Sequence, residues 1–214
     1  KMKQIDFDHG TVTGNILGVA LPMLVAQILS LLYNIVDRIY IARIPSVGTT
    51  ALGAVGLCFP IIVIITAFSN LFGSGGAPLF SINRGKGNIK KAEAIMNTSF
   101  SMLCICGVTL MVIGMLFASP ILVLFGASEE GLSYAYPYMM IYLIGTVPSM
   151  IATGMNPFIN AQGYATSGML SVTIGAVANL ILDPLFIFGL NLGIKGAAIA
   201  TIISQTLSAA DVFY

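Results

Sequence analysis

Six long apolar segments dominate this chain and restrict the folds that are open to it. They cover roughly residues 14–42, 50–81, 93–118, 133–161, 166–189 and 195–214. Each reaches or exceeds the ~20 residues that an α-helix needs to cross the hydrocarbon core of a bilayer. Only 8% of the residues are charged, which is too few to cover a water-facing surface. The sequence therefore predicts an all-α integral membrane protein, with a polar tail over residues 1–13 and a six-transmembrane-helix bundle over residues 14–214.

Several other classes of protein fit this sequence poorly. A net charge of +1 does not supply the basic face that nucleic acid requires. The first apolar segment is too long for a secretory signal peptide, and Asp6 and Asp8 interrupt the basic region that such a signal has. Cys58, Cys104 and Cys106 all lie in apolar runs. We interpret them as small buried hydrophobic residues, because their spacing fits neither a disulfide framework nor a zinc site.

The basic residues of the tail and the connections predict an orientation in the membrane. One side carries six cations, which are Lys1, Lys3, Arg84, Lys86, Lys90 and Lys91. The other side carries two, Arg43 and Lys195. Since cytoplasmic loops are enriched in Lys and Arg, we expect the N-terminus to be cytoplasmic. The expected location is the cell (plasma) membrane, which the chain crosses several times.

Asp37 and Asp183 lie well inside these apolar segments, whereas Glu93 and Asp211 lie near the ends of theirs. A charge at the bilayer centre costs about 2.5–3.5 kcal/mol, so such residues usually face a bundle interior and mark a pathway or a proton relay. Asp37 follows Tyr33 by four residues, and Asp183 follows Asn179 by four, so each acid shares a helical face with a neutral hydrogen-bonding partner. Pro184 permits a bend directly after Asp183. A structural role is the alternative, in which Asn179 only bridges helices and Pro184 only kinks one.

The remaining patterns favour close helix packing over enzyme chemistry. Small residues recur in "GAVGL", "GSGGA", "IGAVAN" and "KGAAIAT", which allows helix backbones to approach each other in a membrane. The glycine-rich "GSGGA" lacks the Lys-Ser/Thr of a phosphate-binding loop. His9 is the one histidine and lies in the polar tail. The sequence contains no recognisable nucleophile–base set or metal cluster, so we do not expect an enzyme.

An ordered set of motifs resembles the multidrug and toxic compound extrusion (MATE) family of transporters. The motifs are "GVALPML", "YNIVDRIYIAR", "ALGAVGLCFP", "NRGKGNIKKAEA" and "INAQGYATSGMLSVTIGAVANLILDPLFIFGLNLGIKGAAIATIISQ". The resemblance runs from residue 10 to about residue 208. It implies one six-helix lobe of a twelve-helix transporter, which exports amphipathic and often cationic drugs or toxic compounds while protons or sodium ions enter.

The resemblance also implies roles for particular residues. The positions that match the coupling site of the family's proton-dependent members are Tyr33, Asp37, Asn179, Asp183 and Thr201. Asn156 or Asn160 matches a further cavity asparagine, and Pro22 matches a first-helix proline at which bending on protonation has been proposed. We expect no cofactor. The coupling ion is H⁺ or Na⁺, and a sodium ion would be held by Asp37, Asn179, Asp183 and Thr201.

The expected partners follow from the same resemblance. Besides the lipid bilayer and small-molecule drugs, a lone lobe needs a C-terminal lobe or a second copy, because alternating access moves one half against another. Two alternatives stay open at this stage. A lipid or lipid-precursor flippase would favour a cationic cavity, whereas the predicted spans contain only Arg38 as a clear cation. A non-transporting membrane subunit or fragment would not need buried acids.

Overall fold

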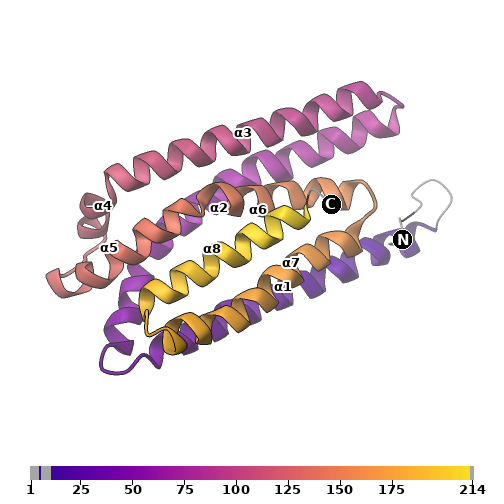
Figure 1. Cartoon of the computed structure of the whole chain (residues 1–214). Helices are drawn as coiled ribbons and strands as arrows, with labels where there is room; N and C mark the ends of the chain where they lie inside the picture. Colours follow the sequence, from indigo (N-terminus) through magenta and orange to yellow (C-terminus); the bar gives the residue numbers. More distant parts are fainter. Residues whose placement is uncertain (1–4, 6–10, 213–214) are drawn as a thin grey trace.

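The computed structural model describes residue 5 and residues 11–212, which fold as a bundle of helices (Figure 1). The helices are α1 (Val12–Ala42), α2 (Gly48–Gly85), α3 (Ile89–Leu116), α4 (Ala118–Leu124), α5 (Glu129–Ile144), α6 (Thr146–Ala161), α7 (Ala165–Pro184), the π-helix η1 (Leu185–Gly189) and α8 (Ile194–Asp211). No strand occurs in this part of the chain. The chain is therefore an all-α membrane protein, as its sequence predicted. The tail residues Lys1, Lys3, Asp6, Asp8 and His9 lie outside the described residues.

Four helical stretches are long and apolar enough to cross a membrane, namely Val12–Ala42, Gly48–Gly85, Ile89–Leu116 and Ala165–Gly189. A fifth crossing results if α5 and α6 are taken together, although they are bent by 56° relative to each other. The apolar pattern of the sequence predicted a single segment over residues 133–161. The break has a local cause, because Pro148 has no N–H to donate to the carbonyl of Ile144, four residues earlier.

Two further helices differ from the expected segments. The third expected segment, residues 93–118, is preceded by an additional turn of α3 and followed by the separate short helix α4, which the sequence analysis did not anticipate. The sixth, residues 195–214, corresponds to α8. This helix is not among those that are long and apolar enough to cross a membrane. α8 packs against α5, α6 and α7 and buries a row of small residues. Because its neighbours shield it from lipid, it can carry more polar residues than a lipid-facing helix.

The helices form two groups that α5, α6 and α8 connect. α1 packs mainly along α7, and α7 packs along α8, while α2 packs on α3 and α6 at the other side of the bundle (Figure 1). Gly73 of α2 and Gly154 of α6 allow one of these close contacts. A Cβ atom at Gly73 would lie only 2.9 Å from the Cα of Gly154. The two backbones therefore touch, which is the use predicted for small residues in membrane helices.

The cysteines are distributed between the interior and the periphery. Cys58 is buried, and its thiol donates to the carbonyl of Ala135 in α5 at 3.7 Å. Cys104 and Cys106 are only half-buried. The expectation of burial is thus confirmed for Cys58 and is wrong for the other two. The α3 surface on which they lie is largely exposed in the bundle, and in a membrane it would contact lipid.

Candidate functional site

Asp183 is the most deeply buried acidic residue that the structure describes. Its side chain is 0% exposed, and Asn179, one turn earlier in α7, is 2% exposed. The amide nitrogen of Asn179 donates to Oδ1 of Asp183 at 3.3 Å, as the four-residue spacing predicts. Oδ2 of Asp183 and Oδ1 of Asn179 are both buried and have no hydrogen-bond partner among the described residues. The pair thus retains two free oxygen acceptors.

The helix changes its geometry directly after this acid. Pro184 has no N–H, so the carbonyl of Leu180 loses its usual partner four residues later. The next five residues form a π-helix, in which the N–H of Leu190 donates to the carbonyl of Leu185 at 2.9 Å. α8 packs closely on this turn, since a Cβ at Gly196 would lie 2.7 Å from the carbonyl carbon of Phe186. Single π-turns of this kind occur frequently at functional sites.

Asp37 of α1 meets Asp183 across the α1–α7 contact. The two carboxyl groups lie within hydrogen-bonding reach of each other, and Oδ1 of Asp37 is buried without a hydrogen-bond partner in the described part of the chain. Tyr33 interacts electrostatically with both acids. Arg38 is exposed, and its guanidinium group lies over the ring of Phe59, 5.6 Å from the centroid. Arg38 therefore influences Asp37 through its charge, while its side chain packs on a neighbouring helix.

Three further residues, which were not predicted from the sequence as site residues, lie next to the cluster of Asp37, Asp183 and their partners. Tyr138 of α5 is 3% exposed and interacts electrostatically with both acids. Tyr142, one turn later, stacks on Tyr138 with their centroids 6.2 Å apart. The hydroxyl of Tyr142 lies within hydrogen-bonding reach of Gln205 in α8. A signal was available in the sequence, because tyrosines in membrane helices usually lie at the membrane interface and these two lie well inside a predicted span.

Thr201 is half-buried in α8, one turn before Gln205. Its hydroxyl donates to the carbonyl of Ala197 at 2.9 Å, within the same helix. Neither Asp37 nor Asp183 is its hydrogen-bond partner among the residues that the structure describes. A role for Thr201 in holding an ion thus stays a prediction.

The structure does not bring Asn156 and Asn160 to the acids. Asn160 donates to the side-chain oxygen of Asn156 at 3.1 Å, and Asn156 donates to the carbonyl of Gly168 at 2.9 Å. Gly168 and Asp183 lie fifteen residues apart along α7, which corresponds to about 22 Å. These asparagines therefore connect α6 to the opposite end of α7. Pro22 lies a similar distance from Asp37, inside the uninterrupted helix α1.

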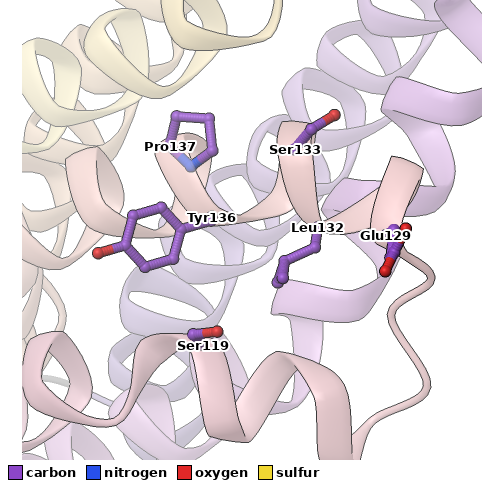
Figure 2. Close-up of a pocket in the computed structure, with 6 residues that line it drawn as sticks. All are labelled: Ser119, Glu129, Leu132, Ser133, Tyr136 and Pro137. Atoms are coloured by element: carbon purple, nitrogen blue, oxygen red, sulfur yellow. The ribbon is translucent and has the colours of Figure 1, made fainter.

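The acids lie away from two open hollows on the surface of the bundle. One has a volume of about 440 Å³ and is lined by Ser119 of α4 and by residues of α5 (Figure 2). In this view Tyr136 and Leu132 lie between the α5 backbone and Ser119. The second, of about 450 Å³, lies between α2 and α3. Neither hollow is lined by Asp37 or Asp183, so the candidate site consists of the buried cluster between α1, α5 and α7.

Comparison with known proteins decides the family. A sequence profile described as MatE matches residues 22–185 of this chain. The chain belongs to the MATE family. The residues matched include Asp37, Asn179 and Asp183, and they extend from Pro22 inside α1 through the end of α7 to Leu185, the first residue of η1. The resemblance drawn from the motifs is therefore confirmed.

Among curated MATE relatives, an FAD transporter from Shewanella oneidensis is 31% identical over 204 residues, which cover 92% of this chain and 44% of the relative. The multidrug export protein MepA from Staphylococcus haemolyticus is 29% identical over 202 residues, which cover 94% of this chain and 44% of the relative. These relatives are transporters and not enzymes. The chain spans about half their length.

Solved MATE structures agree closely with the bundle. A crystal structure of MATE in complex with MaD3S superimposes with a TM-score of 0.90 at 27% identity, covering 96% of this chain and 46% of the other. An outward-facing multidrug resistance MATE transporter gives a TM-score of 0.89 at 27% identity, with 96% and 45% covered. The fold is thus that of one lobe of a MATE transporter, and the chain is a multi-pass membrane protein.

Proposed function

We propose that this chain is the cation-binding lobe of an antiporter that exports amphipathic compounds. The observation that carries the proposal is the contact between Asp37 and Asp183, each of which has a buried oxygen without a partner in the described bundle. Such an arrangement is poorly suited to a purely structural role, because buried charges are expected to be paired. It is well suited to a group that binds and releases a cation.

The electrostatics of the pair explain how coupling would arise. Two ionised carboxylates at hydrogen-bonding distance repel each other, and a bound proton or metal cation removes that repulsion. The state with a cation bound and the state without one should therefore favour different spacings of α1 and α7. Because Asp37 and Asp183 lie on separate helices, cation binding would bias the packing of these helices, which is the kind of change that alternating access requires.

The donor groups suit H⁺ or Na⁺. A proton can be shared between the two carboxyl groups. A sodium ion would use the same carboxylates together with the free Oδ1 of Asn179, with Thr201 as the fourth proposed contributor. The described residues contain no cluster of three or more His, Cys, Asp or Glu side chains that could hold a metal. Neutral oxygens would therefore have to complete the shell of any metal ion.

The charge of the site favours cationic substrates. A carboxylate pair attracts a cationic amphiphile and repels an anion, and the buried tyrosines offer it aromatic surface. This favours drug export over movement of an anionic lipid precursor. It also favours a cationic drug over a dinucleotide, even though one relative is an FAD transporter. We place the protein in the cell membrane with the N-terminus in the cytoplasm, on the distribution of Lys and Arg between the two sides.

The proposal is tested by efflux of ethidium from drug-sensitive cells that express the chain. The chain should be expressed alone and together with the C-terminal half of a MATE relative, because it spans about half the length of those proteins. Asp183→Asn keeps the size of the side chain but removes its charge, and it should reduce efflux to the level of cells without the chain. Asp211→Asn is the matched control, because Asp211 ends α8 and has no contact with the pair that the structure records.

The outcomes separate the parts of the proposal. Full efflux by both Asp37→Asn and Asp183→Asn, at equal expression, would remove its basis. Export of FAD but not of ethidium, still dependent on Asp183, would keep the coupling site and refute the substrate class. In vesicles that contain the active protein, uptake driven by a proton gradient or by a sodium gradient identifies the ion.

A further inference from the structure

A groove runs between α2 and α3. These two helices lie at the edge of the bundle opposite α1 and α7 (Figure 1). The groove encloses about 450 Å³, and its lining includes Leu71, Gly75 and Leu79 from α2 and Lys91, Ile95 and Thr98 from α3. These residues take no part in the acid cluster. The groove is therefore a separate feature of the lobe.

The middle of the groove is bare because of Gly75. A Cβ atom at this position would have no neighbouring atom within 4 Å, whereas at the adjacent Gly76 it would lie 2.5 Å from Oγ of Ser99. Leu71 and Leu79 are one turn before and one turn after Gly75, and they are 60% and 54% exposed. Gly75 thus opens an apolar slot between two exposed leucines.

One end of the slot is positively charged. Lys91 lines it and is exposed, and it lies in the first turn of α3. Residues 84–93 contain four cations, Arg84, Lys86, Lys90 and Lys91, and one carboxylate, Glu93. The hydroxyl of Thr98 donates to the carbonyl of Ala94 in its own helix, so it adds little polarity to the slot. The groove therefore combines an apolar body with a cationic mouth.

The dimensions of the groove match those of one membrane leaflet. Its lining extends over nine residues on each helix, from Leu71 to Leu79 and from Lys91 to Ser99, so its first and last Cα atoms lie about 12 Å apart along the helix axis. Half of the hydrocarbon core of a bilayer is about 15 Å thick. An acyl chain along Gly75 would consequently place its headgroup beside Lys91.

We propose that the α2–α3 groove binds one anionic phospholipid, with its phosphate at Lys91 and an acyl chain along Gly75. Basic pockets between transmembrane helices on the cytoplasmic side commonly hold anionic headgroups. The complementary charge and the leaflet-sized apolar slot carry this assignment. It goes beyond the proposed transport function, because it requires no role for Asp37 or Asp183.

The test uses the chain purified from membranes and reconstituted into nanodiscs of equal parts phosphatidylcholine and phosphatidylglycerol. Native mass spectrometry then counts the phospholipid molecules retained after the disc is removed. Gly75→Leu fills the slot, and Gly56→Leu is its matched control, because Gly56 lies in the same helix and a Cβ there also meets nothing within 4 Å. Lys91→Gln removes the charge at the mouth, with Lys195→Gln as its control.

We expect one phosphatidylglycerol on the unmodified chain and on both controls, none on Gly75→Leu, and about fivefold weaker retention on Lys91→Gln, which is the effect of one lysine near the surface. Equal retention by Gly75→Leu and Gly56→Leu would overturn the location. Equal retention of phosphatidylcholine and phosphatidylglycerol would overturn the preference for an anion. Displacement of the bound lipid by soluble glycerol phosphate would show that the groove recognises a free phosphate, and would overturn the assignment to a phospholipid. Loss of binding to a C-terminal lobe in Gly75→Leu, without loss of lipid, would assign the groove to protein contact.

Discussion

The clearest quantitative prediction concerns two glycines of "GSGGA" that differ only in what they face. Gly73→Ala places a Cβ 2.9 Å from the Cα and 3.0 Å from the carbonyl carbon of Gly154. Both atoms belong to the α6 backbone, so no side chain can rotate away. Gly75→Ala adds the same methyl group to the same helix, where no atom lies within 4 Å. The pair therefore isolates the helix contact.

The expected difference follows from overpacking. Forcing an extra methyl group into a close-packed contact costs about 1–3 kcal/mol. The gain in helix propensity from Gly to Ala is the same for both variants, so it cancels when they are compared. At about 3 °C per kcal/mol for a chain of this length, Gly73→Ala should unfold about 3–9 °C below Gly75→Ala.

The assay uses the buried thiol of Cys58 as a reporter. Cys58 is 2% exposed, so a thiol-reactive fluorogenic dye labels it only when the bundle opens on heating. Cys104 and Cys106 are replaced by serine in both variants, because they are more accessible. Equal midpoints for Gly73→Ala and Gly75→Ala would show that α2 and α6 do not touch at this point, and would refute the packing described above.

Three further predictions test other contacts. Asn179→Leu removes the hydrogen bond to Asp183. Since a bond to a charged group contributes about 1.5–3 kcal/mol, the variant should slow ethidium efflux about 10- to 150-fold; unchanged efflux would exclude Asn179 from the site. Phe158→Ala empties a fully buried position that contacts the ring of Phe80 and should destabilise the bundle by about 3–5 kcal/mol, measured by the same thiol assay, whereas a loss below about 1 kcal/mol would contradict this packing. Ser128→Ala removes the hydroxyl that accepts from the N–H of Gly131 at the start of α5 and should cost about 1 kcal/mol, with Ser133→Ala as a control in the same helix.

The sequence determined those features that depend on local physics. A run of some twenty apolar residues must become a helix in a bilayer, because no other structure satisfies its backbone groups there. The contact between Asn179 and Asp183 follows from their four-residue spacing on one helix. The interruption after Asp183 follows from Pro184, which cannot donate a backbone hydrogen bond. Each of these features could be stated before any helix was placed beside another.

The remaining features depend on which helices pack together, and only the tertiary structure decided them. Asp37 and Asp183 are far apart in the sequence, and their meeting across α1 and α7 was implied by family resemblance alone. Gly73 and Gly75 are equivalent in sequence, yet one touches α6 and the other opens a groove. Tyr142 reaches Gln205 because α5 and α8 pack against each other, whereas Asn156 and Asn160 lie at the far end of α7, away from the acids. Side chains from separate helices acquire a common environment only through packing, and no spacing along one helix encodes it.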